Sequence, residues 1–349
     1  MLRFVLVATL TASASLAAPG HQKRQMTVVE HEMETTSDAE QLVRDYWTAE
    51  RVAAIDHDPF GSEPYPVIPE DEKPRGAPFE VEGLVPRTIG RLLYTEPYTD
   101  EDGGDGWRDS SCTATILESA NEATVVTAAH CLKPNPSVRN DTAWHRNVLF
   151  LPGFRDNEPQ AGGNFTLNRS FMASSWANGL EKPEYMYHVD RAFAVLNVNS
   201  AAGGKLARRD LGPGQKIRFG NNATSFPVVH NLGYPRYVAD PGNELRSGAP
   251  AFTGRRLAAC FGKAVDWWRF PSNMAGSPCL MGGGSSGGPH MADFDFEQGV
   301  GSVVAVNSLL DVDGPVGEGE PERELMEYGT SVTDEFAKLL YDTAQAVEL

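Results

Sequence analysis

No long apolar run occurs in this sequence after its first 20 residues, so nothing later supplies the roughly 20 consecutive apolar residues of a membrane-spanning helix. The first stretch, MLRFVLVATLTASASLAAPG, is itself too short to span a bilayer. It combines Arg3, a short apolar run and small residues at Ser15 and Ala17, the pattern of a cleaved secretory signal. We assign residues 1–18 to a signal peptide and expect a soluble, secreted, extracellular protein with no membrane partner after signal removal.

Basic residues are too few for a nucleic-acid-binding protein. The chain has 30 Lys and Arg against 47 Asp and Glu, a net charge of −17. Residues 25–87 carry 15 acidic and 5 basic side chains, and residues 311–349 carry 11 and 2, so the region between them is nearly neutral. Because a nucleic-acid partner calls for a basic face, we expect no nucleic acid. We expect the protein to be a monomer.

Cysteine is scarce, and its four copies lack the Cys-x-x-Cys spacing of a four-cysteine zinc site. Cys112 and Cys131 are separated by the same interval as Cys260 and Cys279. Three disulfide connectivities are possible in an exported protein. We favour the two local pairs, because each would tie down one motif region and closing a loop of this size stabilises a fold by roughly 3 kcal/mol in the chain-entropy model.

The segment from Gln25 to Arg87 has little hydrophobic periodicity beyond DAEQLVRDYW. It is acidic, and it has prolines at positions 59, 64, 66, 69, 74, 78 and 86. Such a composition is weakly structured on its own. We interpret residues 19–87 as a leader or propeptide and the protein as a precursor; the possible processing sites are Lys23-Arg24 and Arg87, for which an ordinary surface charge is the alternative.

Long helical patterns are also scarce. From Arg87 onward the chain consists of short β-rich runs broken by Gly, Pro and Asn, among them TIGRLLYT, CTATILES, ATVVTAAH and FAVLNV, which is typical of a sandwich or of barrels. The exception is TDEFAKLLYDTAQAV, where Thr333 is expected to cap a helix with Phe336, Leu339 and Leu340 on one face. The fold class predicted is all-β with a C-terminal helix.

Three separated motifs carry the parts of a nucleophilic site. VVTAAHC places His130 after an apolar strand, HVDRAFAVLNV places Asp190 at the start of another, and CLMGGGSSGGPHM holds Ser286 in a glycine-rich loop. A serine hydroxyl becomes a useful nucleophile when a histidine takes its proton and a carboxylate orients that histidine. The glycines would let the N–H groups of Gly284 and Ser286 converge on a developing oxyanion.

These motifs resemble those of the chymotrypsin-like serine peptidases, in which TAAHC carries the histidine and a GDSGGP-type loop carries the serine. The chain order His, Asp, Ser is also that of this family. RTIGRLLYT, DRAFAVL, GYP and GGSSGGP are most similar to its secreted glutamyl-endopeptidase-like microbial branch. The resemblance covers roughly residues 88–345. It implies a peptidase domain, residues 88–349, of two packed antiparallel six-stranded β-barrels, roughly 88–205 and 206–349. It also implies that Ser286 is the nucleophile, His130 the general base and acid, and Asp190 the orienting carboxylate.

The resemblance also gives Ser285 a meaning. In trypsin-type members this position is an aspartate that pairs with the new N-terminus after activation, and a serine cannot form that ion pair. Removal of a propeptide would therefore have to order the site in another way. A decayed site is the alternative interpretation, and the intact set of three catalytic residues weighs against it.

The sequence departs from the glutamyl-endopeptidase pattern where the substrate side chain would bind. VVAVNSLL, residues 303–310, lacks the histidine expected to hold a substrate carboxylate, and the hydroxyl position four residues before the nucleophile is Gly282. The position of the pocket aspartate of trypsin is Leu280. Burying a charged substrate group without a partner is costly, so we expect cleavage after apolar or small residues. The predicted substrate pocket consists of Leu280, Gly282, Asn307, Ser308 and Leu309, beside Val306.

The remaining polar motifs are given plainer interpretations. TDEDGGDGWRD, residues 99–109, fits no EF-hand spacing and is expected to be a solvated turn. HEMET, residues 31–35, lacks the second histidine of a metalloprotease helix. Trp267 and Trp268 are expected to pack, with a substrate subsite as the alternative. Surface or packing roles are expected for His145, His188, His230 and His290, and glycosylation sequons stand at Asn140, Asn164, Asn168 and Asn222.

Together these features predict a secreted serine endopeptidase that needs no cofactor or metal and acts on protein or peptide substrates. The alternative is a secreted binding protein of the same fold without turnover.

Overall fold

The structure is a computed structural model of the chain. It describes residues 26–55, 76–79, 83–99, 103–137, 143–155, 158–159, 163–179, 183–198, 207, 211–237, 252–269, 273–312 and 325–349. The predicted signal peptide and the pair Lys23-Arg24 lie outside these residues. Arg87 is described, and it is exposed in the short helix α3 (Val85–Thr88).

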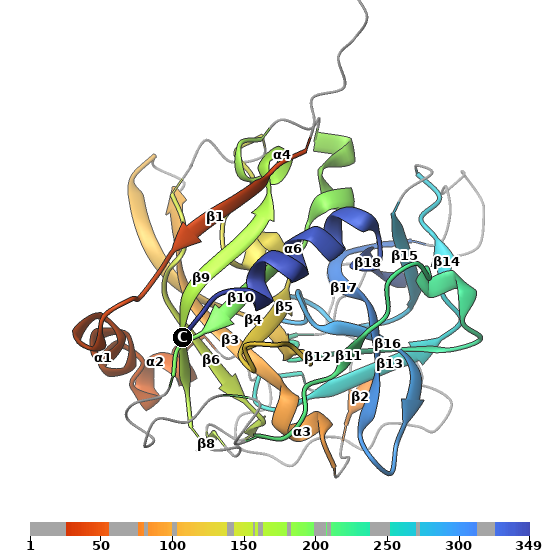
Figure 1. Cartoon of the computed structure of the whole chain (residues 1–349), viewed down its shortest axis with the longest axis horizontal. Coiled ribbons are helices and arrows are strands. Elements are labelled where there is room, and N and C mark those ends of the chain that lie inside the picture. Colours follow the sequence, from red (N-terminus) through yellow and green to blue (C-terminus); the bar gives the residue numbers. More distant parts are fainter. Residues whose placement is uncertain are drawn as a thin grey trace, which may run out of the picture.

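The first half of the molecule is a closed barrel of six antiparallel strands (Figure 1). The strand order is β9-β10-β5-β4-β3-β6, and pairing of β6 with β9 closes it. Strands rich in Val, Leu, Phe and Thr fit such a surface because β-branched and aromatic side chains pack well on a pleated sheet. The strands are β3 (Ile89–Thr99), β4 (Asp105–Ile116), β5 (Thr124–Thr127), β6 (Arg146–Pro152), β9 (Phe165–Ala173) and β10 (Ala192–Leu196).

The second half is a nine-stranded sheet whose main path runs β14-β15-β18-β17-β16-β12-β13-β2, with β11 paired to β17. It lies beside the first barrel in Figure 1. Its strands are β2 (Ala77–Pro78), β11 (Lys216–Ile217), β12 (Val229–Gly233), β13 (Ala258–Gly262), β14 (Val265–Asp266), β15 (Met274–Pro278), β16 (Pro289–Asp295), β17 (Val300–Val312) and β18 (Leu325–Ser331). The predicted all-β, chymotrypsin-like fold class with a C-terminal helix is confirmed.

Both expected disulfides are present. Cys112 on β4 is joined to Cys131, with an S–S distance of 2.04 Å, and Cys260 on β13 is joined to Cys279, just after β15, at 2.03 Å. The second bridge ties β13 to the end of β15, at opposite ends of the main strand order of the second sheet.

The C-terminal helix α6 (Glu335–Gln345) packs on the first barrel, not on the second sheet that precedes it. Its N-cap is Asp334, whose side chain accepts a hydrogen bond from the Ala337 N–H, so the expected cap at Thr333 is wrong by one residue. The buried face is formed by Ala337, Leu340 and Ala344, whereas Leu339 is 48% exposed. The helix crosses the front of the barrel in Figure 1.

Part of the predicted leader is folded onto the first barrel. Strand β1 (Val28–Glu32) pairs with β9, which adds a seventh strand to the outside of the barrel sheet. Helices α1 (Ser37–Tyr46) and α2 (Ala49–Ala54) follow, each capped by a threonine side chain. Residues 26–55 are therefore regular structure in the complete chain, where the composition had indicated little.

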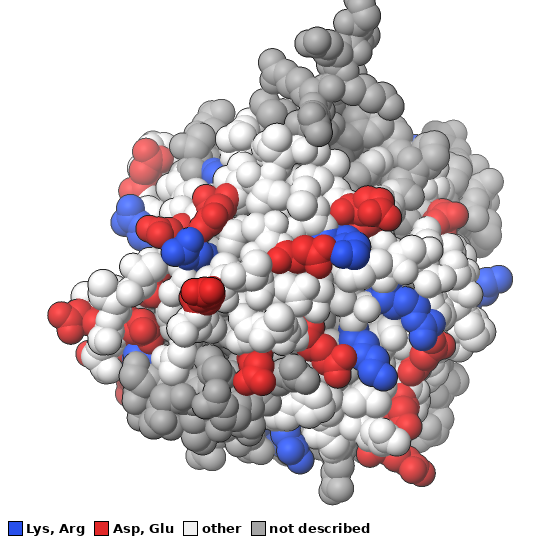
Figure 2. Space-filling model, in the orientation of Figure 1, with Lys and Arg blue, Asp and Glu red and all other residues white. Residues whose placement is uncertain are grey.

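Several short elements complete the chain. They are the hairpin of β7 (Phe154–Arg155) and β8 (Glu158–Pro159), helix α4 (Ser174–Ala177), and the 3-10 helices η2 (Ala129–Cys131), η3 (Pro183–Val189) and η5 (Ala223–Ser225). In the described part of the chain, no helix is both long enough and apolar enough to span a membrane. Figure 2 shows acidic and basic side chains interspersed over the face that carries α6, without a continuous basic surface there.

Candidate active site

His130 is held at the end of a barrel strand by a short, covalently anchored turn. Strand β5 ends at Thr127, and His130 occupies the middle of η2, whose last residue, Cys131, is bridged to β4. His145 packs behind this turn: its ring stacks on Tyr94 with centroids 4.4 Å apart, and its Nδ1 is 3.0 Å from the Cys131 carbonyl oxygen. The backbone of His130 is thus fixed while its side chain remains partly exposed.

Asp190 is fully buried and receives three hydrogen bonds. Its Oδ2 lies 2.7 Å from His130 Nδ1, its Oδ1 accepts from the His130 backbone N–H at 2.9 Å, and the Ser308 hydroxyl donates to Oδ2 at 2.6 Å. A buried carboxylate is tolerated when donors surround it in this way. Because Asp190 faces Nδ1, the His130 ring is oriented with Nε2 directed away from the carboxylate.

The next residue anchors Asp190 to the C-terminal helix, a contact that the sequence analysis missed. Arg191 is buried, with its guanidinium 2.7 Å from the Asp334 carboxylate and 2.6 Å from the Ser331 carbonyl oxygen. Asp334 is also the N-cap of α6. Through this ion pair and this hydrogen bond, Arg191 joins the segment just before β10 to the start of the last helix and to the end of β18.

The serine-containing loop, residues 282–286, has all of its carbonyl oxygens turned toward donors. This arrangement fixes the direction of every peptide group in the loop, since each carbonyl points away from the N–H that follows it. The donors, at 2.8–3.1 Å, are Ser285 Oγ for Gly282, Arg236 N for Gly283, Thr113 Oγ1 for Gly284, Asn307 Nδ2 for Ser285 and Thr113 N for Ser286.

Three N–H groups of this loop are left available. In the described residues, the N–H groups of Gly283, Gly284 and Ser286 have no acceptor. Gly284 has a φ of +104°, which an L side chain rarely adopts, and a Cβ there would collide with the Tyr234 carbonyl oxygen. At Gly287, with φ +78°, a Cβ would collide with the Thr127 hydroxyl of the other barrel. The glycines thus permit a sharp turn pressed between the two halves.

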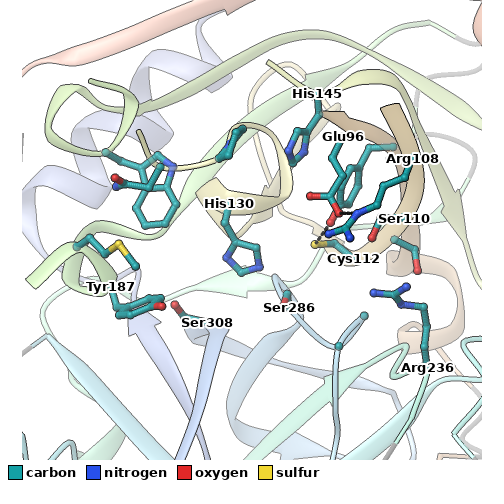
Figure 3. A pocket seen from close by; sticks show the side chains of 18 residues that line it. Glu96, Arg108, Ser110, Cys112, His130, His145, Tyr187, Arg236, Ser286 and Ser308 are labelled. Carbon is teal, nitrogen blue, oxygen red and sulfur yellow. Dashed lines mark hydrogen bonds and ion pairs between the residues drawn. The ribbon is translucent and has the colours of Figure 1, made fainter. Parts of the chain in front are cut away.

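A cavity of about 340 Å³ brings His130 and Ser286 together. In Figure 3 the imidazole of His130 points down toward Ser286, and Ser308 and Tyr187 lie on one side of the serine while Ser110 and Arg236 lie on the other. The cavity is lined by both halves of the molecule, from β3 and β4 of the barrel to the loop of Ser286. The residues predicted from three distant motifs, His130, Asp190 and Ser286, are therefore neighbours.

Only one of the five residues expected to form the substrate pocket lines this cavity. Ser308 does so, and the pairing of β17 with β18 shifts between Asn307 and Leu309, which leaves Ser308 as a bulge residue. Bulges re-aim a side chain beside active sites. Its neighbours point elsewhere: Asn307 holds the loop of Ser286, and Leu309 packs on the cluster of Trp267 and Tyr328.

The other two expected pocket residues are also placed differently. Gly282 lies against Tyr237, and a Cβ at this position would come within 2.5 Å of the Tyr237 ring. Leu280 is partly buried and does not line the cavity. The lining instead includes three charged side chains that the sequence analysis did not select, Glu96, Arg108 and Arg236.

Ser285 faces a buried acid. Its hydroxyl donates to the Gly282 carbonyl oxygen at 2.8 Å and lies 3.4 Å from Oε2 of Glu327 on β18. Glu327 is 2% exposed, and burial raises the pKa of its carboxyl well above the usual value, against the opposing effect of the Ser285 hydrogen bond. The position that holds an acid in GDSGGP-type loops is thus a serine here, and a buried acid from another strand lies under it.

The buried Glu327 predicts a pH-dependent stability. Since the folded state retains a proton that the unfolded chain releases, the free energy of unfolding is highest below the ordinary glutamate pKa and falls as pH rises toward the folded-state pKa. The expected slope in that window is about 1.4 kcal/mol per pH unit. Urea unfolding between pH 5 and 8 measures it. Glu327→Gln should remove its share of this slope and leave that of Glu34, whose pKa burial raises to about 7. Glu297→Gln, on the surface, should keep the whole slope; equal slopes in all three proteins would contradict the assignment.

The Cys112–Cys131 bridge predicts a coupled loss of stability and activity. Replacing both cysteines with alanine is expected to lower the free energy of unfolding by roughly 3 kcal/mol in the chain-entropy model. It should also slow any reaction that depends on His130, because Cys131 is the next residue in η2. Thermal unfolding and labelling with a fluorophosphonate, measured well below the melting temperature, test both. An unchanged labelling rate would show that the bridge is not needed to position His130.

A metal site at His130 is excluded by the chemistry of its neighbours. Cys112, His130 and Cys131 offer potential ligand atoms within 4.8 Å of one another. Both sulfurs are, however, joined in a disulfide, and the ligand that a cysteine provides is a thiolate. One histidine nitrogen then remains, which is insufficient to hold an ion.

The secondary candidates fall mostly into packing roles. His145, His230 and His290 are buried, and burial lowers the pKa of His290 to about 3, so its ring is neutral. His188 packs against Trp267, which is buried and donates to Asp311, whereas Trp268 is 37% exposed.

The remaining surface expectations concern a turn and the sequons. The described part of TDEDGGDGWRD is largely exposed, but most of it is strand: Thr99 ends β3 and Asp105–Asp109 begin β4, and of the described residues Gly103 and Gly104 lie between them. Asn140 lies outside the described residues. Asn168 lies on β9, and its side-chain amide donates a hydrogen bond to the side-chain oxygen of Asn197. Glycosylation of the described sequons stays a prediction.

Comparison with protein-family models finds no match, and comparison with curated proteins finds none. Among solved structures, the protease Anisep from Arthrobacter nicotinovorans is 26% identical, with a TM-score of 0.53 over 76% of this chain and 99% of its own. The thermostable serine protease AL20 from an extremophilic microorganism is 26% identical, with a TM-score of 0.55 over 75% and 98%. The chain has the fold of chymotrypsin-like serine proteases, and these similarities support peptidase activity in general.

Proposed function

We propose that this protein is a secreted serine endopeptidase, and that Ser286, His130 and Asp190 carry the reaction. The observation that supports this most directly is the convergence in one cavity of a serine hydroxyl, a histidine oriented by a buried carboxylate, and two N–H groups without acceptors. The structural similarity to serine proteases points to the same chemistry.

In the proposed reaction, the Ser286 hydroxyl attacks the carbonyl carbon of a peptide bond while His130 Nε2 takes its proton. The oxyanion that forms is stabilised by the N–H groups of Gly284 and Ser286. His130 then donates the proton to the leaving amine, which leaves an acyl group on Ser286. Water, deprotonated by His130, attacks the acyl carbon. The bond from that carbon to Ser286 Oγ then breaks, Oγ takes the proton from His130, and the second product is released. Asp190 keeps the imidazole oriented and stabilises its charged form through both steps.

A fluorophosphonate probe tests the proposal on the purified secreted protein. Stoichiometric labelling, together with hydrolysis of a peptide library, is the expected result. Absence of both would favour the alternative, a binding protein of the same fold without turnover. No cofactor enters this reaction, and peptides or proteins are the partners proposed for it.

The protein is also proposed to be a precursor with residues 19–87 as its leader, removed or nicked in the active form. The packing of β1, α1 and α2 on the barrel favours a nick after which residues 26–55 remain bound, because their removal would expose buried core. No residue of 26–55 lines the cavity. Within the described chain, this segment is therefore a support of the barrel and not a plug in the site.

The expected specificity at the cleaved bond is for apolar or small residues before it. Of the residues predicted to form the pocket for the substrate side chain before the cleaved bond, Ser308 lines the cavity, and it is uncharged. Glu96, Arg108 and Arg236 lie on the opposite side of Ser286 (Figure 3). Profiling on a peptide library measures the preference. Dominant cleavage after glutamate, lysine or arginine would contradict this prediction.

A further inference from the structure

Arg236 places an unpaired positive charge beside the proposed nucleophile. Its side chain lines the cavity, and Figure 3 shows it on the side of Ser286 that faces Ser110, opposite Ser308 and Tyr187. Among the described residues its guanidinium has no hydrogen bond or ion pair, and its Nε is buried without a partner. A buried donor without an acceptor is costly, so an acceptor from outside the chain would be bound favourably there.

The position of Arg236 is fixed by the same loop that holds Ser286. Its backbone N–H donates to the Gly283 carbonyl oxygen at 2.8 Å. The side-chain stem runs between two glycines: a Cβ would lie 3.1 Å from Arg236 Cγ at Gly254 and 3.2 Å at Gly284. The backbone of Arg236 and the start of its side chain are therefore held against the loop of Ser286.

The other charges of the cavity do not compensate Arg236. Glu96 is the acidic residue of the lining, and its Oε1 is 2.8 Å from Nε of Arg108, so it is already neutralised. Among the described residues, the lining therefore has one cation in excess, within a protein of net charge −17. An arginine fork matches the geometry of a carboxylate with two parallel hydrogen bonds.

We propose that Arg236 binds an acidic side chain of the substrate on the carboxyl side of the cleaved bond, at the first or second residue after it. This inference rests on the proposed function, which places the residue before the bond on the Ser308 side, so that the leaving half of the substrate runs over Ser110 and Arg236. The protein would then prefer substrates with an uncharged residue before the cleaved bond and an acidic residue after it.

Matched peptides test this specificity. They share one sequence and differ only in having Asp, Asn or Lys at the first or at the second position after the cleaved bond. For the wild-type protein, kcat/KM is expected to be about tenfold higher for Asp than for Asn at one of these positions, and lowest for Lys, because a charge-assisted hydrogen bond distinguishes them. The ratio should fall at high salt.

Arg236→Ala is expected to bring the Asp/Asn ratio close to one while the Asn peptide is still cleaved. Arg236→Glu should invert the order in favour of Lys. Arg218→Ala is the matched control: Arg218 is paired with Asp293, does not line the cavity, and should keep the wild-type ratio. Fluorophosphonate labelling of each variant establishes that the nucleophile is intact, and Arg236→Lys provides a second variant that keeps the charge.

The outcomes separate this inference from the proposed function. A wild-type protein that cleaves the Asn and Asp peptides equally, or an Arg236→Ala variant that keeps the Asp preference, overturns the role of Arg236 and leaves the peptidase in place. A wild-type protein that cleaves no peptide and takes no label overturns both.

Discussion

Ser286→Ala is expected to abolish fluorophosphonate labelling and to lower peptidase activity by about ten-thousandfold or more, because no other residue can supply the attacking oxygen at that point. The fold should be unaffected. Ser286 is held through its backbone, whose carbonyl accepts from Thr113, and its side chain is not used by the surrounding loop. Labelling stoichiometry by intact mass, with a melting curve for each protein, measures both statements.

Ser285→Ala is the matched control from the adjacent position. The Ser285 hydroxyl points away from the cavity to the Gly282 carbonyl and to Glu327, so its loss should weaken the loop but leave labelling measurable. The two neighbouring serines thus have separable roles. Strong labelling of Ser286→Ala, or loss of labelling in Ser285→Ala alone, would show that the assignment of the nucleophile is wrong.

Much of the site could be anticipated because its parts stand in compact local motifs. His130 beside Cys131, Asp190 at the start of a strand, and Ser286 in a glycine-rich loop each have a recognisable sequence setting. The disulfides also follow from local spacing, and short strands separated by turn residues indicate barrels.

What the sequence could not indicate depends on contacts between distant segments. Glu327 under Ser285, Arg191 with Asp334, and Arg236 beside the cavity are ordinary charges in the sequence, and tertiary packing alone distinguishes them. The prediction of the substrate pocket was wrong for a different reason. Successive side chains of a strand point to opposite faces, so the four residues 306–309 cannot all line one cavity, and the bulge turns Ser308 toward it.

The contacts of the N-terminal segment could not be predicted because its partner surface lies far along the chain. The periodicity of DAEQLVRDYW is visible, and the helix there is α1. Its apolar face, however, is covered by barrel residues about 50 and 100 positions later, among them Leu93, Leu149 and Leu151. Proline content and charge say nothing of that contact.

Disrupting this contact is expected to destabilise the whole barrel. Trp47 is 8% exposed and joins Val43 and Val52 in the core cluster that contains Leu93 and Leu149, and its indole N–H donates to the Asn147 carbonyl oxygen at 2.6 Å. Trp47→Ala removes a large buried side chain and a buried hydrogen bond. We expect it to lower the free energy of unfolding by about 3–5 kcal/mol, measured by urea unfolding of the complete chain.

Leu42→Ala is the control on the same helix. Leu42 is 71% exposed, so its truncation should change the stability by less than about 0.5 kcal/mol. If the active form is nicked after residue 55, size-exclusion chromatography followed by N-terminal sequencing should find both fragments together in wild-type and Leu42→Ala protein. In Trp47→Ala a larger share of the smaller fragment should dissociate than in Leu42→Ala protein, since the packing of Val43 and Val52 and the pairing of β1 with β9 are then left to hold it. Active wild-type enzyme that has lost residues 26–55 and kept its melting temperature would refute this structural role for the leader.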